Sequence, residues 1–180
     1  MSIEPTLLTL FSASLSYPGD EGHLENISKC NELIQKSSKK AAKNFTKFKE
    51  NLEGYNQSEL EELYTRTFDI NGICSLDVGF VLFGEDYKRG ALLVEISRLF
   101  REYNLDPKSE LPDHLPNVLR LLAHIKDEDE SEQIIEKLVI PAVDNIIAKF
   151  GKGAGRQNVF FPALESLKSL LEDSLEEYEF

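Results

Sequence analysis

The sequence predicts an all-α protein, a single-domain bundle of about eight or nine helices over residues 1–180. Three observations predict this fold class. Apolar residues recur every three or four positions along most of the chain, which is the spacing of helices buried on one face. The strand-like run 76–83 has no second run with which it could pair. No stretch rich in Pro, Gly or Ser divides the chain, and no repeat of the solenoid type occurs.

The composition limits the kinds of partner. The 180 residues include 20 Lys+Arg and 32 Asp+Glu, a formal net charge of −12, and 41% of them are hydrophobic. A chain of this size buries enough surface to fold without metal or disulfide support. Its acidity disfavours a nucleic-acid partner, which needs a concentrated basic face, and disfavours docking on anionic lipid. An acidic surface instead attracts a basic peptide or protein.

The cysteines and the N-terminal residues indicate a cytoplasmic protein. Cys30 and Cys74 belong to no CxxC pair, so a secreted disulfide framework is not expected. Glu4 stands where a secretory signal would carry positive charge. No segment approaches the roughly 20 apolar residues that cross a bilayer, so we expect no direct membrane insertion.

The first third of the chain predicts helices at 7–15, 24–34 and 41–52. The first helix ends before 17–20, because Pro18 removes a backbone donor and Gly19 relaxes the backbone. Gly54 ends the third helix. Ser58 and Glu61 fit a capping box that opens a fourth helix, whose apolar residues run to 67.

In the middle of the chain, residues 71–72 predict a turn and 76–83 a short helix. The clearest helical pattern covers 92–103 and ends near Asn104. Asp113 is expected to cap the following helix, which runs to 122, because a carboxylate satisfies free N–H groups at a helix start.

The last third predicts two helices and a loop. A long helix at 134–150 is expected to bend at Pro141. A Gly-rich loop follows, and then a helix at 164–175 with an acidic tail. The tail is expected to be a solvated helix face, with attraction of a basic partner as the alternative.

No set of residues in the sequence predicts catalysis, a metal site or a cofactor. His23, His114 and His124 form no HExxH and no Glu-x-x-His pair. Asp113 with His114 could act as an acid/base pair, although adjacent helical residues point in different directions. Cys74 with His114 could form a thiolate pair in space. A helix cap and a buried thiol are the commoner roles of such residues.

The loop Gly151–Gly155 supports an alternative function. Its glycines expose backbone N–H groups, and Lys152 and Arg156 supply charge, as in phosphate-binding loops. It lacks the GxxxxGK[ST] spacing, however, and no strand precedes it, so a surface connection is the commoner explanation. A nucleotide-binding helical protein or small hydrolase remains one alternative, and a helical adaptor unrelated to metalloenzymes is another.

Aromatic residues of the middle third predict either core packing or an apolar groove. Tyr64, Phe68, Phe80 and Phe83, with Leu76, could line a groove that accepts a partner helix. The run 80–83 leads into the charged corner 84–86, and 111–116 forms a second corner where charge adjoins apolar residues. Two such corners could frame one peptide site, with carboxylates that meet basic residues.

These residues also carry a resemblance to a known family. The ordered motifs are Tyr64-x-x-x-Phe68-Asp69, Ser75-Leu76, Leu82-Phe83-Gly84-Glu85-Asp86 with Arg89-Gly90, and Glu110-Leu111-Pro112-Asp113-His114-Leu115-Pro116. Their order and spacing resemble the nitrate reductase delta-subunit chaperones (NarJ type) of the wider TorD-like family. The resemblance is closest over residues 60–125.

The resemblance implies an all-helical, cytoplasmic chaperone that is not an enzyme. Such proteins bind the N-terminal segment of a molybdoenzyme catalytic subunit until the bis-molybdopterin guanine dinucleotide cofactor and iron–sulfur clusters are inserted. Asp113 and His114 match the family's peptide-contact corner. The expected peptide-binding residues are Tyr64, Phe68, Leu76, Phe80, Phe83, Asp86, Arg89, Asp113, His114 and Leu115.

The resemblance leaves the client and the oligomeric state open. The residues 81–83 stand where many of these chaperones carry His-x-His. The client is therefore nitrate reductase or a relative that acts on selenate, chlorate, perchlorate or hydrocarbons. We expect a monomer or a domain-swapped dimer, because a helix pair could exchange between protomers.

Overall fold

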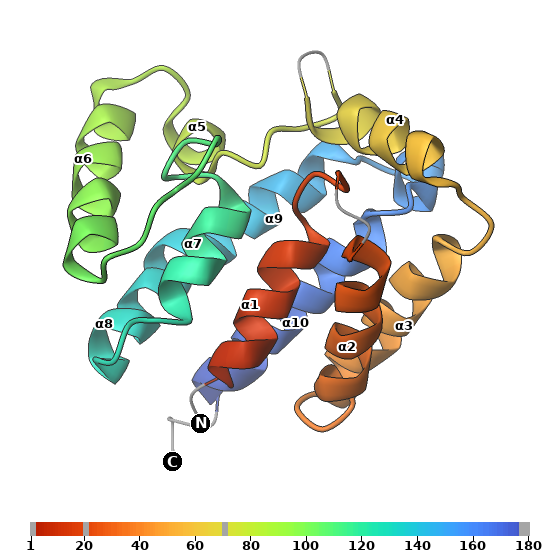
Figure 1. Cartoon of the computed structure of the whole chain (residues 1–180). Helices are drawn as coiled ribbons and strands as arrows, with labels where there is room; N and C mark the ends of the chain where they lie inside the picture. Colours follow the sequence, from red (N-terminus) through yellow and green to blue (C-terminus); the bar gives the residue numbers. More distant parts are fainter. Residues whose placement is uncertain (1–2, 20–21, 70–71, 177–180) are drawn as a thin grey trace.

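The segments in which apolar residues recur every three or four positions fold into a helical bundle in the computed structural model of the chain (Figure 1). The structure describes residues 3–19, 22–69 and 72–176. The α-helices are α1 (Pro5–Ser14), α2 (His23–Ile34), α3 (Lys39–Asn51), α4 (Gln57–Phe68), α5 (Val78–Phe83), α6 (Tyr87–Glu102), α7 (Leu115–Leu122), α8 (Glu128–Ile134), α9 (Ile140–Lys149) and α10 (Phe161–Glu176). These ranges contain no strand, and the predicted all-α class is confirmed.

The predicted long helix contains a local change of winding. A π-helical turn, Ile135–Val139, joins α8 to α9 without a break, so these three segments form one continuous rod. Pro141 lies in the first turn of α9, directly after the π turn. A proline cannot donate its backbone hydrogen bond, and such a defect is commonly absorbed by a local widening of the helix. With this rod counted once, the helix number agrees with the prediction of about eight or nine.

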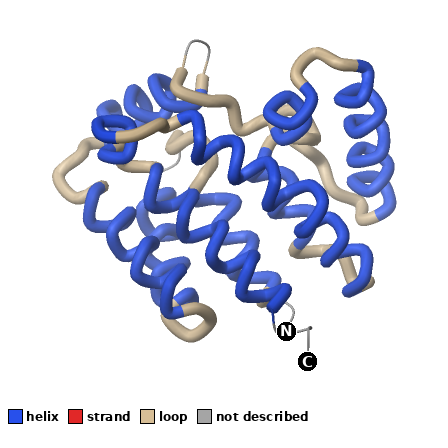
Figure 2. Tube along the Cα trace, turned by 180° about the vertical axis from the view of Figure 1, so that it is seen from behind, coloured by secondary structure: helices blue, strands red, loops and turns tan. Residues whose placement is uncertain are grey.

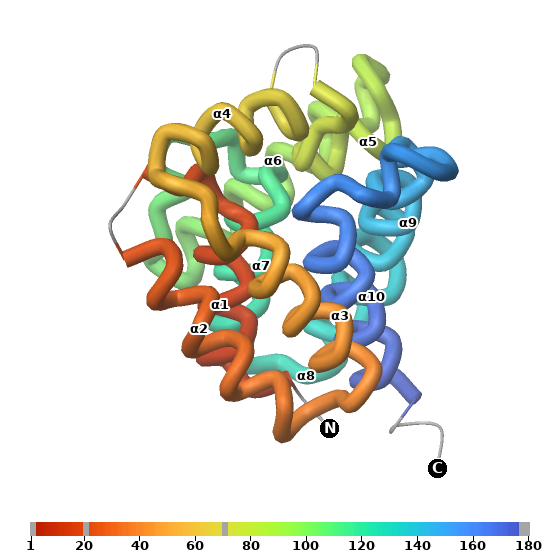
Figure 3. Tube along the Cα trace, turned by 90° about the vertical axis from the view of Figure 1, so that its right-hand side faces the viewer, coloured from red at the N-terminus to blue at the C-terminus, as the bar shows by residue number. Residues whose placement is uncertain are grey.

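The bundle has two layers that share one core (Figure 1, Figure 3). In one layer α1 packs between α2 and α7, and in the other α10 packs between α3 and α9. The two layers meet where α2 packs on α3. Aromatic rings fill the centre: Phe45 meets Phe11 at 5.0 Å and Phe48 at 5.5 Å between ring centroids. Full burial of each such ring stabilises the fold by about 2–3 kcal/mol.

The helix ends follow the predicted signals, with one correction. Gly54 has a φ of 91° after α3, and Asn104 has a φ of 53° after α6, as expected of residues that end helices. The capping box lies two residues earlier than predicted. Asn56 Oδ1 accepts the Glu59 amide at 3.0 Å, and Glu59 Oε2 accepts the Asn56 amide at 2.8 Å. Asn is a cap as good as Ser, and the choice between them depends on where the turn before α4 ends.

Helices α5 and α6 lie at the edge of the bundle (Figure 1, Figure 2). The clearest helical pattern, 92–103, belongs to α6, which packs mainly on α5 and buries only Ile96, Leu99 and Phe100 fully. Tyr87 is 80% exposed and Val94 is 69% exposed. This edge therefore presents apolar surface, a feature typical of interaction sites.

Three predictions concern residues outside the described part of the chain: the break at 17–20 includes Asp20, the turn at 71–72 includes Asn71, and the acidic tail includes Glu177 and Glu179. Among the helices that are described, none has both the length and the apolar character to cross a bilayer.

Candidate functional site

Two segments far apart in sequence cross where α5 and α7 begin. Asp77 and His114 form an isolated antiparallel β-bridge. The run 76–83, expected as one short helix without a partner strand, is therefore divided: its first two residues join the bridge, and α5 begins after them. Two backbone hydrogen bonds of 2.8 Å flank the bridge, from the Leu115 amide to the Leu76 carbonyl and from the Val78 amide to the Asp113 carbonyl.

Asp113 lies in the turn before α7, and its side chain points into α5. Its Oδ2 accepts the backbone N–H of Gly79 at 3.1 Å and Nε–H of Arg89 at 3.2 Å. The carboxylate thus caps the first turn of α5, and the prediction that it caps the helix after it is wrong. Because Asp113 is 0% exposed, its carboxylate is out of reach of a partner bound at the surface.

Arg89 pairs with Asp113 and also with Asp77, a carboxylate nearer the surface. Arg89 Nη2 lies 3.2 Å from Asp77 Oδ2, and His114 Nδ1 lies 3.0 Å from Asp77 Oδ1. The hydrogen bond with His114, together with the electrostatic interactions with His114 and Arg89, lowers the pKa of Asp77 against the opposing effect of burial. We call Asp113, Arg89, Asp77 and His114 the ion-pair network; it fixes α5 and α6 on the start of α7.

An open groove lies beside this network, on the α5 side of the bridge. It encloses about 730 Å³, within the range of ligand-binding clefts. Residues 72–75 form one side, α5 forms the other, and Lys149 at the end of α9 closes it. We call it the α5 groove, and its lining residues are Phe68, Asp69, Gly72, Ile73, Cys74, Ser75, Asp77, Phe80, Val81, Gly84 and Lys149.

The walls of the α5 groove are apolar and partly open to solvent. Phe80 is 41% exposed and Ile73 is 40% exposed, while Phe68 lies deeper, at 8%. The Arg89 guanidinium stands 5.4 Å from the centre of the Phe80 ring, a cation–π contact. The ion-pair network therefore also holds Phe80 against the groove.

A second, polar groove lies on the other side of the bridge. It encloses about 520 Å³ between α1, α2 and the loop before α7. His114 contributes to this groove, whereas its partner Asp77 contributes to the α5 groove. Asn117 holds the loop in place, because its Nδ2 donates to the carbonyls of Pro107 and Leu111, both at 2.9 Å.

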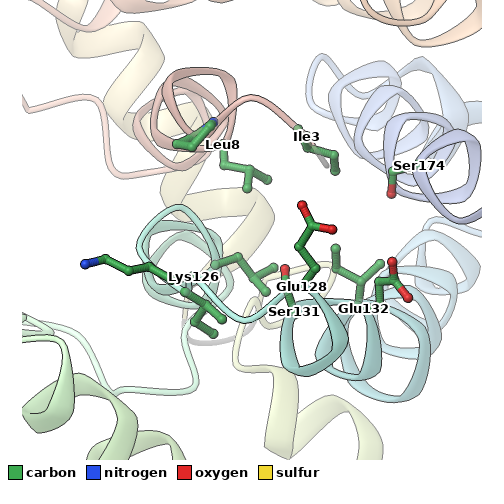
Figure 4. Close-up of a pocket in the computed structure, with 11 residues that line it drawn as sticks. Ile3, Leu8, Lys126, Glu128, Ser131, Glu132 and Ser174 are labelled. Carbon is green, nitrogen blue, oxygen red and sulfur yellow. The ribbon is translucent and has the colours of Figure 1, made fainter. Parts of the chain in front are cut away.

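A third pocket lies at the opposite end of the bundle (Figure 4). It encloses about 150 Å³ between α1, α8 and α10. Figure 4 shows Glu128 directed into the opening between Ile3 and Ser174, and Lys126 directed away from it. This volume is below that of a typical ligand cleft, so the α5 groove is the better candidate site.

Comparison with known proteins gives the family. The family model described as nitrate reductase delta subunit matches residues 33–150, nearly two-thirds of the 180 residues. The chain belongs to this family. No curated protein matches the sequence.

Membership in the delta-subunit family implies a role in the assembly of a molybdoenzyme and an interaction with its catalytic subunit. The matched region contains both sides of the β-bridge, the whole ion-pair network and every residue that lines the α5 groove. The predicted resemblance to NarJ-type chaperones is thereby confirmed at the level of the family.

The delta-subunit fold separates the predicted site residues into buried and accessible groups. Tyr64, Leu76 and Leu115, like Asp113, are 7% exposed or less, so the expectation that they line an open groove is corrected. Tyr64 instead donates its hydroxyl to the Leu15 carbonyl at 2.9 Å. Leu76 and Leu115 are buried where the β-bridge pairs their segments, whereas the Tyr64 ring packs against Phe68 and Phe160.

The accessible group lies at three places. Phe68 and Phe80 line the α5 groove. Phe83, 37% exposed, belongs to α5 but does not line the groove, and Asp86 caps α6 by accepting the Lys88 amide at 2.9 Å. Arg89 and His114 belong to the ion-pair network described above.

Sequence reasoning missed Asp77, which links the two grooves. Its position directly before the apolar run 78–83 is a signal of a helix N-cap, and Asp is a preferred residue there. Ile73, Val81 and Lys149 were also missed. Nothing in the local sequence brings Lys149 to this site, because it comes from the far end of α9.

The catalytic alternatives find no support in the local geometry of the delta-subunit fold. Burial raises the pKa of the Cys74 thiol to about 12, which disfavours the thiolate that the alternative pair with His114 would need. His114 pairs with Asp77 and not with Asp113. Within the described ranges, no group of three or more His, Cys, Asp and Glu residues is placed to hold a metal ion.

The Gly-rich loop is closed on itself. Gly153–Gln157 forms a short 3-10 helix, and Arg156 Nε donates to the Gly151 carbonyl at 3.2 Å. The Arg156 guanidinium also stacks over Phe161, 5.8 Å from the ring centre. Arg156, one of the two cations of the loop, is thus engaged within the fold, as in a structural connection between two helices.

Proposed function

We propose that this protein is a system-specific assembly chaperone. It binds the N-terminal segment of a molybdoenzyme catalytic subunit in the α5 groove and holds that segment for insertion of the molybdenum cofactor. The client is nitrate reductase or a close relative. The observation that carries the proposal is the α5 groove itself, an open and largely apolar cleft within the region that matches the family.

The chemistry of the α5 groove suits an amphipathic peptide. Phe80, Ile73 and Val81 offer apolar surface for side chains of the client segment. Asp69, Asp77 and Lys149 also line the groove, so it offers charges of both signs to polar residues of the client. Both Asp77 oxygens are already paired with Arg89 and His114, and these partners hold the pKa of its carboxyl below the usual value.

A temporary complex also agrees with these features. A flexible N-terminal segment loses conformational freedom when it is ordered in the groove, which reduces the net affinity. The ion-pair network holds the groove in shape before the peptide arrives, so the chaperone itself is already organised. Moderate affinity permits release once the client has folded around its cofactor.

We place the chaperone in the cytoplasm and propose that it acts as a monomer or a domain-swapped dimer, without a nucleic-acid partner. Both cysteines, Cys30 and Cys74, are free thiols in the structure, and unpaired thiols suit a reducing compartment.

The Phe80→Ala variant tests the groove directly. We expect the affinity for a synthetic peptide of the first residues of a nitrate reductase catalytic subunit to fall at least about tenfold, because buried aromatic anchors dominate such interfaces. Isothermal titration calorimetry on the full chain measures the change. Phe80 is 41% exposed, so its loss should leave the fold intact.

Tyr87→Ala is the matched control for this titration. Tyr87 is an exposed aromatic residue on the neighbouring helix, and it does not line the groove. We expect its affinity to equal that of the unchanged protein. Equal affinities for the unchanged protein and Phe80→Ala would refute the groove as the peptide site.

A further inference from the structure

The outer face of α3 carries a row of lysines on an acidic protein. Lys39, Lys40, Lys43 and Lys47 are all exposed. At 3.6 residues per turn they lie within about 100° of one another around the helix axis. The opposite face, with Ala41, Ala42, Phe45 and Phe48, is buried against the core. We call the four residues the lysine stripe.

The lysine stripe has no counter-charge among the described residues. None of its four side chains forms an ion pair there, although six other Lys, Arg and His side chains pair with Asp or Glu elsewhere in the described ranges. The whole chain has a formal net charge of −12. Like charges placed side by side on one helix destabilise it, so this arrangement has a cost within the fold.

The packing of α3 fixes the backbone that carries the lysine stripe. Figure 3 shows α3 between α2 and α10, and it packs against both. The Ser38 hydroxyl caps α3 by accepting the Ala41 amide at 3.1 Å, and the Ser166 hydroxyl of α10 donates to the Ala41 carbonyl at 2.7 Å. On the α2 side, Thr46 donates to Asn31 at 3.0 Å. The backbone that carries the four lysines is therefore in place before a partner binds, and only the side chains have to be ordered.

The lysine stripe is short and bounded by acidic residues. Lys39 and Lys47 are eight residues apart, which is about 12 Å along a helix. Glu32 precedes the stripe in the chain, and Glu50 and Glu53 follow it, all three exposed. Charges beyond about 8 Å are largely screened at physiological salt, so a partner must match the stripe closely.

We propose that the lysine stripe is a second interaction surface, one that binds a compact acidic face on a folded protein, such as two turns of an acidic helix. The short length decides between partners. A nucleic-acid duplex or an anionic bilayer extends well past the stripe and would meet the acidic residues at its ends. This surface lies on another helix than the α5 groove and does not depend on the proposed chaperone function.

The test measures binding of the full chain to a fluorescent helical peptide that carries glutamates at every fourth position. We expect binding that weakens as salt is raised and falls at least about tenfold in the triple variant Lys40→Glu, Lys43→Glu, Lys47→Glu, because each exposed pair contributes modestly and three are reversed. The triple Gln variant at the same positions should also lose affinity, by a smaller factor. Fluorescence anisotropy gives each dissociation constant.

The control variant is Lys88→Glu, Lys126→Glu, Lys137→Glu, which changes the net charge equally at exposed sites outside α3. Its affinity for the acidic peptide should fall by no more than the few-fold that the change in net charge alone causes. Equal losses in the two triple variants would overturn the proposal, as would no binding of the acidic peptide. Tighter binding of a short DNA duplex, or of phosphatidylserine vesicles, would also overturn it in favour of those partners.

Discussion

Replacing Asp113 with alanine is expected to lower the free energy of unfolding by about 3 kcal/mol. The carboxylate is completely buried and serves both the Gly79 amide and the Arg89 guanidinium. Its removal leaves a buried helix N-terminus without an acceptor and part of Arg89 without a counter-charge. Chemical denaturation followed by circular dichroism measures the loss.

Two variants separate this effect from a general loss of charge. Asp113→Asn keeps an oxygen for the Gly79 amide and removes only the charge, so a smaller loss is expected. Asp86→Ala removes an exposed cap of α6 and should cost about 1 kcal/mol. If Asp113→Ala were as stable as the unchanged protein yet failed to bind peptide, Asp113 would contact the peptide. Its assignment to a buried structural role would then be wrong.

Gly79→Ala is expected to destabilise the protein by about 2 kcal/mol, although alanine normally favours a helix. A Cβ atom at this position would lie 2.7 Å from Asp113 Oδ2 and 3.0 Å from Arg89 Cγ. Both atoms belong to the ion-pair network and cannot withdraw without breaking it. Thermal and denaturant unfolding measure the change.

Gly90→Ala provides a control of opposite sign. Gly90 lies inside α6, and a Cβ atom added there meets nothing within 4 Å. This substitution should stabilise the protein by about 0.5–1 kcal/mol, since glycine is a poor helix former. A neutral or stabilising Gly79→Ala would show that the contact between Asp113 and α5 is looser than described.

The predictions for Asp113 and Gly79 assign a structural role to part of the motif 110–116. Asp113 and Leu115 support the site from beneath, while Phe80 and Ile73 present the surface that a peptide can touch. His114 lies between these groups, because it is largely buried but contributes to the polar groove. Loss of peptide binding in an Asp113 variant would therefore need a stability measurement before it could be interpreted.

The fold class and most helices could be predicted from the sequence, because helical periodicity is a local property. Stripes such as Leu7, Leu8 and Phe11 lie on one face of a helix whatever surrounds them, and all three are buried. End signals such as Gly54 are equally local. The capping box was misplaced by two residues because Asn56 and Ser58 are both good caps.

The site could be predicted only in part, because its geometry depends on pairing between distant segments. The bridge between Asp77 and His114 turns Asp113 toward α5, and no local pattern around 113 contains that information. Lys149 reaches the α5 groove only through the packing of α9 on α5. The order of the motifs indicated the correct region of the chain. Which residues of that region are buried could be learned only from the tertiary structure.

The central claim is that the α5 groove holds the client's N-terminal segment, and photo-crosslinking tests it most directly. Benzoylphenylalanine would replace Phe80 or Ile73 in the groove, and Tyr87 or Leu24 at exposed positions elsewhere. With a nitrate reductase N-terminal peptide, we predict crosslinks from positions 80 and 73 and none from positions 87 and 24. Crosslinks from positions 87 or 24 alone would contradict the account.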